Sequence, residues 1–330
     1  MSEPVPSLLE VDSVEVLVLV DNASDNLSSV PATVEPETTR LSRRGGAVVT
    51  GAGLCVAAHG LACLVTVRWG DEHRTLLFDA GPDGEVFSRN VQRLGVDLGR
   101  VEAVVLSHGH WDHAGGMPRA LDLIRAGGGE RAIPFLAHDD MFHQRAAKRP
   151  DGSYRLKQDV PSLRELATHG AHVTLTTGPE LLADGHALVS GEIPRITPFE
   201  TGLPGQHRRI DPLAAWEPDE QLLDERFLAV NVRNEGLVVL TACSHAGVIN
   251  VLTHAAELVP GTPIRGVFGG LHLAGTNERI IPQTVDHLAG FDPALVAPGH
   301  CTGWRAVGAL AQRFGEQRLV PLSVGKRFTV

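Results

Sequence analysis

The segment Ser107-His108-Gly109-His110-Trp111-Asp112-His113 places four potential metal ligands within six residues. It follows the apolar run 101–106, which predicts a short buried strand, and small residues at 109 and 114–116 predict a tight loop after it. Imidazole and carboxylate groups suit zinc, iron or manganese, and the absence of a nearby cysteine argues against a structural zinc–thiolate site. Ligands crowded in this way indicate a bound cation, because without one they would repel each other or stay unsatisfied.

The composition indicates a globular protein whose partner is not a nucleic acid. The 330 residues are 43% hydrophobic and 21% charged, with a formal net charge of −10. This composition fits a loop-rich chain with a sizeable core, and we expect a single domain over residues 1–330. An acidic balance weighs against a nucleic-acid substrate, because proteins that bind one normally carry a basic face.

The cysteines and the apolar runs predict a cytoplasmic protein that has no contact with a membrane. Cys55, Cys63, Cys243 and Cys301 form no C-x-x-C pair, so a disulfide framework is not expected and a reducing compartment is favoured. Residues 1–15 are acidic and lack the basic start of a secretory signal. The apolar run 16–20 is far shorter than a membrane span.

Short apolar runs predict alternating strands and helices. Strands are expected at 14–20, 53–57, 62–68, 75–78, 133–137, 227–232, 236–241, 264–268 and 295–297, and helices at 83–94, 117–126, 248–258 and 280–288. Residues 21–46 are too long and polar for a plain turn, which leaves a flap over a site or a mobile surface loop. Residues 139–224 have a looser pattern and are interpreted as an inserted or elaborated region.

Three later histidines share one placement. His245, His272 and His300 each lie just past the end of a predicted strand. Because strand ends meet at one edge of a sheet, these side chains are expected to join the loop that carries His108. His59 is an intermediate case, and the histidines in polar stretches are interpreted as surface residues: His138, His143, His169, His172 and His207.

These motifs resemble those of a known family. Residues 107–113 match the H-x-H-x-D-H signature of the metallo-β-lactamase superfamily, and the preceding Leu77-Phe78-Asp79-Ala80-Gly81 is typical of it. Within that superfamily, several segments are similar to the dihydropterin-phosphate-synthase-like branch, and the likeness runs over residues 14–322. These segments are 58–61, 191–195, 241–247, 269–273 and 298–303.

The resemblance implies an α+β fold of the αββα sandwich type, that is, the metallo-β-lactamase fold with an elaborated mid-chain insertion. It also implies two divalent metal ions in a cleft at the sheet edges. Zinc is favoured, with manganese or iron as alternatives. In the superfamily pattern the first metal would be held by His108, His110 and His245, and the second by Asp112, His113 and His300.

The chain departs from this pattern at one position. The strand that usually ends in a bridging aspartate ends here in Ala242-Cys243-Ser244-His245. Three alternatives stay open: Cys243 is a soft ligand, a water or hydroxide bridges alone, or only one metal binds tightly.

The resemblance implies a hydrolase-type enzyme in which a metal-bound hydroxide attacks a small anionic metabolite, phosphorylated and pterin-like or nucleotide-like. Asp112 would orient that hydroxide, and His272 would donate a proton or contact the substrate. Asp79 is expected to brace the ligand loop by hydrogen bonds. Substrate contacts are expected from His59 and from Arg195 with Glu192, a pair that either reaches an anionic group or forms a surface ion pair.

Three other functions are alternatives for this sequence. A di-iron oxidoreductase of the flavodiiron kind has glutamate where His110 stands and an appended flavin domain, and this chain has neither. An RNA-processing nuclease fits poorly with the acidic charge. A non-catalytic metal-binding or sensor protein would keep the ligands and turn over nothing. The sequence does not name the substrate or the native metal, and it leaves a homo-oligomer open.

Overall fold

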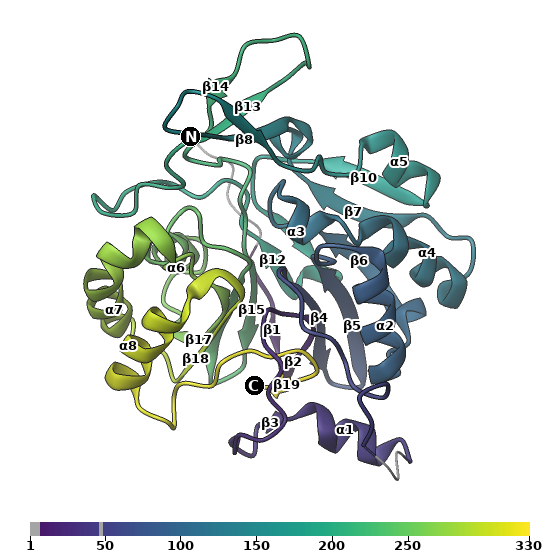
Figure 1. The fold of residues 1–330 in the computed structure, drawn as a ribbon. Helices are drawn as coiled ribbons and strands as arrows, with labels where there is room; N and C mark the ends of the chain where they lie inside the picture. The colour runs from purple at the N-terminus through teal and green to yellow at the C-terminus, as the bar shows by residue number, and fades with distance from the viewer. Residues whose placement is uncertain (1–6, 46–48) are drawn as a thin grey trace.

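Two large β-sheets pack face to face, and helices cover the outer face of each (Figure 1). The computed structural model describes residues 7–45 and 49–330. The arrangement is the αββα sandwich that the sequence predicted, and this fold class is confirmed. Among the described residues, no helix has the length and apolar character needed to cross a membrane.

The first sheet has the strand order β11-β12-β15-β16-β17-β18, with β1 beside β15. Its strands are β1 (Glu10–Val11), β11 (Glu180–Leu182), β12 (Ala187–Val189), β15 (Leu228–Val232), β16 (Gly236–Thr241), β17 (Ile264–Gly270) and β18 (Leu295–Gly299). Three helices pack on its outer face: α6 (Val248–Leu258), α7 (Ile281–Gly290) and α8 (Trp304–Phe314). The parallel strands β16, β17 and β18 end at the same edge, which brings the segments that follow them together.

The second sheet has the order β10-β7-β6-β5-β4-β2-β19-β3. Its strands are β2 (Ser13–Val20), β3 (Val34–Glu35), β4 (Ala62–Trp69), β5 (Glu72–Phe78), β6 (Val101–Val105), β7 (Ile133–Ala137), β10 (Ala171–Leu175) and β19 (Arg327–Thr329). The helices on its outer side are α1 (Glu37–Arg43), α2 (Gly84–Leu94), α4 (Met117–Gly128) and α5 (Leu163–Thr168). The short helix α3 (Trp111–Ala114) lies in the ligand loop.

Strand β2 shows how the sequence specifies a sheet that is buried on both faces. Val14, Val16 and Val18 point into the core between the two sheets, whereas Leu17 and Leu19 pack with the helices outside. Successive side chains of a strand point to opposite faces, so a strand covered on both sides reads as a continuous apolar run. The core between the sheets therefore fixes how their ends face each other.

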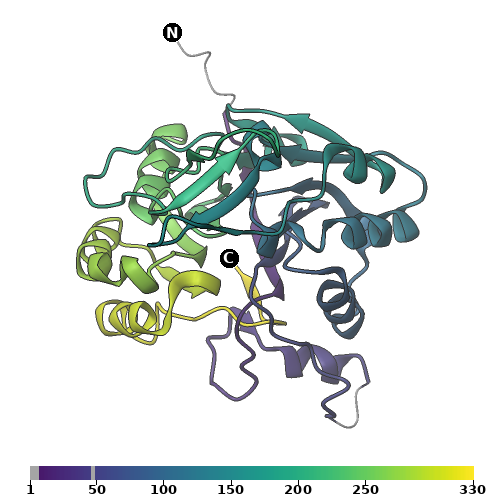
Figure 2. The ribbon, with the colours of Figure 1, turned by 45° about the horizontal axis from the view of Figure 1, so that its top comes forward.

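A third, four-stranded sheet lies across one end of the sandwich (Figures 1 and 2). Its order is β14-β13-β8-β9, with β8 (Gln144–Lys148), β9 (Tyr154–Leu156), β13 (Gln206–Arg209) and β14 (Glu217–Pro218). All four strands come from the region 139–224. The same region also supplies β10 to the second sheet and β11 and β12 to the first.

Three details of the sequence prediction need correction. His138 and His207, which were interpreted as surface residues, are buried. The strand expected at 53–57 is a loop, because the amide of Cys55 donates to Glu37 and that of Val56 donates to Asn90, so side chains replace a neighbouring strand. Residues 21–45 form neither a flap nor a plain loop, since β3 pairs with β19 and α1 packs against α2. Residue 46 lies outside the described residues.

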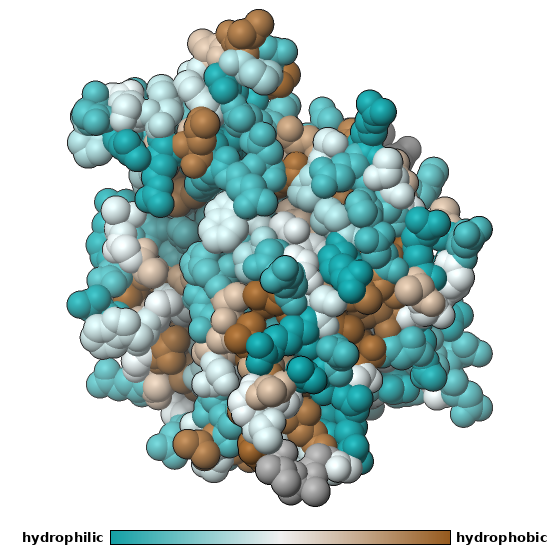
Figure 3. All heavy atoms as spheres, turned by 45° about the vertical axis from the view of Figure 1, so that its right-hand side comes forward, coloured by the Kyte–Doolittle hydropathy of each residue, from teal (hydrophilic) through white to brown (hydrophobic). Residues whose placement is uncertain are grey.

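On the face drawn in Figure 3, hydrophobic residues are scattered among hydrophilic ones. The most exposed large hydrophobic side chains include Leu27, Leu213 and Trp304, which belong to separate parts of the chain. Single exposed hydrophobic residues are common on protein surfaces.

Candidate metal centre

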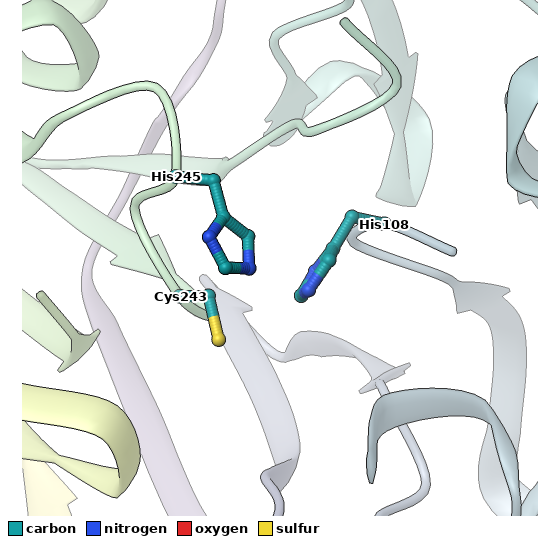
Figure 4. Close-up of side chains that lie close together, drawn as sticks. All are labelled: His108, Cys243 and His245. Carbon is teal, nitrogen blue, oxygen red and sulfur yellow. The ribbon is translucent and has the colours of Figure 1, made fainter. Parts of the chain in front are cut away.

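The potential ligands come from strand ends of both large sheets. The loop after β6 carries His108, His110, Asp112 and His113, while Cys243 and His245 follow β16 in the other sheet. Figure 4 shows His108 facing Cys243 and His245 from the opposite side. His272 follows β17 and His300 follows β18. The centre therefore lies on the boundary between the two sheets.

His108, His110 and His245 form the first group of imidazoles. Nε2 of His108 lies 3.0 Å from Nδ1 of His110, and the ligand atoms of His108, Cys243 and His245 lie within 4.8 Å of one another. Two nitrogens on one tetrahedral zinc lie about 3.3 Å apart, so the first distance suits a shared ion. Burial, together with nearby cationic groups, holds the pKa of all three rings well below 6.5, so they are in the neutral form that binds metal.

His245 gives the direct test of whether a cation fits. Its side chain is buried, yet among the described residues neither Nδ1 nor Nε2 has a hydrogen-bond partner. Buried polar atoms are rarely left without a partner, because desolvation without a new bond is costly. The main chain of this residue is fixed by Glu225, whose carboxylate accepts hydrogen bonds from the amides of His245 (2.7 Å) and Ala246 (2.6 Å). These nitrogens and the neighbouring donors fit a borderline-soft divalent metal.

Asp112 is the centre of a second group. Its Oδ2 lies 3.4 Å from Nε2 of His300, 3.4 Å from Nε2 of His59 and 3.8 Å from Nε2 of His113. Burial alone would raise the pKa of this carboxyl, but His113 and His300 hold it below its usual range. Asp112 is therefore an ionised carboxylate among imidazoles, which is a suitable set for a second divalent cation.

Cys243 lies between the two groups. Its Sγ is 3.3 Å from Nε2 of His113, and it is close to His108 and His245 on one side and to His113 and His300 on the other. This residue stands where the family pattern has a bridging aspartate. Its position is compatible with one of the three alternatives left open by the sequence, in which Cys243 is a soft ligand.

Asp79 orients His113 from behind. Its carboxylate lies 2.7 Å from Nδ1 of His113 and accepts hydrogen bonds from the amide and hydroxyl of Ser107 (2.8 and 2.7 Å). Burial alone would lower the pKa of His113, but Asp112 and Asp79 raise it to about 9. In the metal-free protein the ring is therefore protonated, and a metal at Nε2 would displace that proton. This is the bracing role that the sequence analysis expected of Asp79.

A buried ion-pair network holds the peptide between the first two histidines. Gly109 donates its amide hydrogen to Asp224 (2.7 Å) and accepts a hydrogen bond from Arg145 at its carbonyl (2.7 Å). Arg145 also pairs with Asp224 (2.8 Å) and Asp219 (2.9 Å). A side chain at Gly109 would collide with the main chain of Met141 at 2.4 Å. The sequence analysis missed these residues, all of which lie in the region it interpreted as inserted or elaborated.

Asn22 links the late histidine to His59. Its Oδ1 lies 3.0 Å from Nδ1 of His300, and its Nδ2 lies 3.1 Å from Nδ1 of His59. The neighbouring Asp21 accepts the amide hydrogen of His300 at 2.8 Å. These two residues follow β2, and the sequence analysis did not assign them a role at the site, because they carry no motif of their own.

The backbone is strained at several of these positions. Four residues other than glycine have left-handed conformations at the centre: Asp79 (φ 61°), Ser244 (φ 56°), His272 (φ 42°) and His300 (φ 48°). Such conformations cost about 1–3 kcal/mol each and persist only where the surrounding structure enforces them. These four residues lie in the segments that follow the strands and carry the candidate ligands.

A cavity of about 490 Å³ opens onto the ligands. Its lining residues are Asn22, His59, His110, Trp111, Asp112, Lys157, Leu203, Cys243, His245, His272, Ala274, His300, Cys301 and Gly303. Lys157 is the one lysine or arginine among these lining residues. Its Nζ donates to Gln206 (2.6 Å) and lies 3.1 Å from Nε2 of His110. Burial, with a further contribution from Arg145, lowers the pKa of this amine to about 8.

The structure brings His59 and His272 into this cavity but not Glu192 and Arg195. Arg195 donates to the backbone carbonyls of Ile193, Gln221 and Leu222, so its guanidinium is used within the fold. Glu192 pairs with Nε2 of His138 at 3.0 Å. The substrate contact expected of this pair, and the surface ion pair between them, are both absent among the described residues.

Comparisons with known proteins agree with this geometry. Residues 60–208 match the family model described as the metallo-beta-lactamase superfamily. The chain is 26% identical over 268 residues to a 7,8-dihydropterin-6-methyl-4-(beta-D-ribofuranosyl)-aminobenzene-5'-phosphate synthase of Methanocaldococcus jannaschii, covering 78% of this chain and 85% of that protein. It is 28% identical over 258 residues to an uncharacterized protein of the same organism, covering 78% and 88%.

A solved structure has the same fold. A metal-dependent hydrolase of the beta-lactamase superfamily superposes with a TM-score of 0.69 at 23% identity, covering 96% of this chain and 99% of the other. Residues 60–208 therefore resemble the metallo-β-lactamase superfamily, and the chain as a whole shares the fold of that hydrolase.

Proposed function

We propose that this chain is a metal-dependent enzyme that hydrolyses a small phosphorylated metabolite carrying a flat, pterin-like ring. One observation carries the proposal. The two ring nitrogens of buried His245 have no partner among the described residues, in a cavity where other imidazoles, a thiol and a carboxylate converge. Groups of this kind gather around a cation, and the adjoining cavity leaves room for a substrate.

The ligand assignment follows the two groups described above. His108, His110 and His245 would hold one ion, Asp112, His113 and His300 would hold the other, and Cys243 would contact both. Imidazole with a thiolate favours zinc over magnesium or calcium. When bound, such ions lower the pKa of water and stabilise negative charge on a phosphoryl or carbonyl oxygen.

The cavity wall supports an anionic substrate with a flat ring. Lys157 presents its amine to the cavity and is held there by Gln206. Trp111 lies on the wall with its ring centroid 5.9 Å from that of His59, and it offers an aromatic surface for stacking. A volume of about 490 Å³ is within the range of small-molecule sites. The synthase relative is named for a compound that contains both a dihydropterin and a phosphate.

The remaining polar residues have roles that follow from their positions. Asp112 would bind the second ion and orient the attacking oxygen, because its carboxylate faces the cavity between His59 and His300. His272 has a buried Nδ1 without a partner among the described residues, and its ring lines the cavity. It would donate the proton that the leaving group requires.

The test combines metal analysis with turnover. We expect the purified protein to contain about one to two equivalents of a transition metal, and to turn over at least one member of a panel of phosphoesters, lactones, thioesters and phosphorylated pterins. His110→Ala should abolish turnover, whereas His172→Ala, an exposed residue on β10, should not. Full activity in His110→Ala would contradict the proposal. Bound metal without turnover would instead support a sensor.

The relative's name favours a second candidate, a metal-dependent synthase that joins a pterin to a phosphorylated partner. The two reactions differ in the fate of water. Hydrolysis places oxygen from isotope-labelled water in a product, and bond formation between two substrates does not. Mass spectrometry of the products therefore separates the candidates.

A further inference from the structure

A second thiol lies beside Cys243, and the two-metal assignment does not use it. Sγ of Cys301 is 3.4 Å from Sγ of Cys243. The ligand atoms of Cys243, His272 and Cys301 all lie within 4.8 Å of one another, and all three side chains line the cavity. These residues form a compact group with two sulfurs and one imidazole, open to solvent on the cavity side.

The backbone is shaped to bring these three side chains together. His272 has a left-handed conformation (φ 42°), and its Nδ1 has no partner among the described residues. Gly270 leaves the space that the thiol of Cys301 occupies, because a Cβ there would lie 2.6 Å from that sulfur and 2.4 Å from the carbonyl oxygen of Ala242. An alanine at this position would have to displace the main chain. The group is therefore built into the strand ends of β17 and β18.

We propose that Cys243, His272 and Cys301 form a further, sulfur-rich metal site that takes a thiophilic divalent cation such as Zn²⁺ or Cd²⁺. Two thiolates on one tetrahedral zinc lie about 3.7 Å apart, close to the separation seen here, and two sulfurs with one imidazole leave a fourth position open on the cavity side. Soft sulfur ligands select zinc and cadmium over hard cations such as magnesium.

The site shares a ligand with the centre described above. Cys243 would bridge a cation held here to the ions bound by the histidines, and His272 would no longer be free to donate a proton. Binding at this site does not depend on the proposed function. A second consequence does rest on it: an excess of thiophilic metal inhibits turnover.

The chain contains a matched control for thiol chemistry. Cys55 and Cys63 are also buried, but they belong to no group of metal-binding residues in the described part of the chain. Cys55 lies near Glu37 and Asn90 at the edge of α2, and it does not line the cavity. Cys55→Ser thus removes a thiol without touching the proposed site.

The experiment is a cobalt titration of the chelator-treated, phosphine-reduced protein, followed by the thiolate-to-cobalt charge-transfer absorption in the near ultraviolet. We expect the intact chain and Cys55→Ser to show the same band. In Cys301→Ser the band should lose about half of its intensity, because one of the two thiolates is removed. The same variant should bind about one equivalent of cobalt fewer than the intact chain. X-ray absorption on the zinc-loaded protein should count correspondingly fewer sulfur neighbours in Cys301→Ser.

Two results would overturn the proposal. One is a Cys301→Ser protein with the stoichiometry and charge-transfer band of the intact chain. The other is the absence of a thiolate-to-cobalt band in the fully reduced protein, in which a thiol titration shows that both Cys243 and Cys301 are free. His110→Ala separates this proposal from the catalytic one, since it should weaken the histidine site but keep the sulfur band. Loss of the band in His110→Ala with retention in Cys301→Ser would place the bound thiolate in the histidine centre alone and reject the further site.

Discussion

The carboxylate of Asp224 accepts a hydrogen bond from the amide of Gly109 at 2.7 Å, so a residue more than a hundred positions away fixes the peptide between His108 and His110. Arg145 holds the carbonyl of the same residue and pairs with Asp224. All of these groups are buried. The orientation of the first two ligands is thus determined by an ion pair outside the ligand loop.

Asp224→Ala should therefore reduce both stability and metal affinity. Breaking a buried ion pair from one side costs about 3–5 kcal/mol, because Arg145 keeps its charge and loses one of its two carboxylate partners. Loss of a group that orients a ligand lowers metal affinity about 10–100-fold. Denaturant unfolding of the metal-free protein and competition with a chelator measure the two effects. Asp151→Ala removes an exposed carboxylate that accepts hydrogen bonds from Ser153, and it should change neither.

Asp79→Asn tests the support of His113. Asparagine tolerates the left-handed conformation of residue 79, so the substitution removes the charge with little change in backbone strain. We expect metal affinity to fall about 10–100-fold, because the carboxylate no longer fixes the tautomer of His113. Isothermal titration with zinc measures this. An affinity equal to that of the intact protein would show that Ser107 and the loop orient the ring without the charge.

The pH dependence of stability should differ between the metal-free and metal-loaded protein. Burial alone would lower the pKa of His113, but Asp112 and Asp79 raise it in the folded state to about 9, from 6.5. The contribution of His113 to the free energy of unfolding is therefore fully present below pH 6.5 and is lost as the pH rises through 9. We expect the free energy of unfolding of the metal-free protein to lose about 3 kcal/mol over that range relative to His113→Asn.

Metal loading should remove this trend, because a bound ion requires the neutral ring. The comparison with His113→Asn cancels the titration of groups that the two proteins share. The pKa values of His108, His110 and His245 are lowered, so these rings change stability below pH 6.5 and not in the window above it. A metal-free protein whose stability difference from His113→Asn is flat between pH 6.5 and 9 would contradict the assignment.

Lys157→Met should weaken binding of anionic substrates without removing the metal. A hydrogen bond to a charged group contributes about 1.5–3 kcal/mol, which corresponds to about a 10–100-fold rise in KM or in the inhibition constant of inorganic phosphate. Lys157→Arg should keep part of the effect, since it retains the charge. Elemental analysis serves as the control for metal content. A lower kcat with unchanged KM would assign Lys157 to the positioning of His110 instead, with which its amine is in contact.

The convergence of the candidate ligands could be predicted because several of them follow strand ends. His108, His245 and His300 each come after an apolar run, and parallel strands of a sheet end at the same edge. That argument needs only the order of the elements. The fold class was expected on different grounds, because residues 77–81 and 107–113 resemble the motifs of a known superfamily.

Lys157 and Arg145 could not be predicted in this way. They lie on or beside β8 and β9, which are short strands in a polar region. They reach the candidate ligands because β8 pairs with β13, about sixty residues away along the chain. No local pattern encodes such a pairing. The strand expected at 53–57 was wrong for a related reason, because Glu37 and Asn90 satisfy the amides that a strand neighbour would have taken.

The position of the candidate centre on the boundary between the sheets would give a bound metal a mechanical role. His108 and His113 belong to one sheet, whereas His245 and His300 belong to the other. A metal held by both sets is a cross-link that fastens one half of the sandwich to the other. Removing it would loosen the whole molecule along that boundary, so resistance to proteolysis and to pulling forces should report metal occupancy.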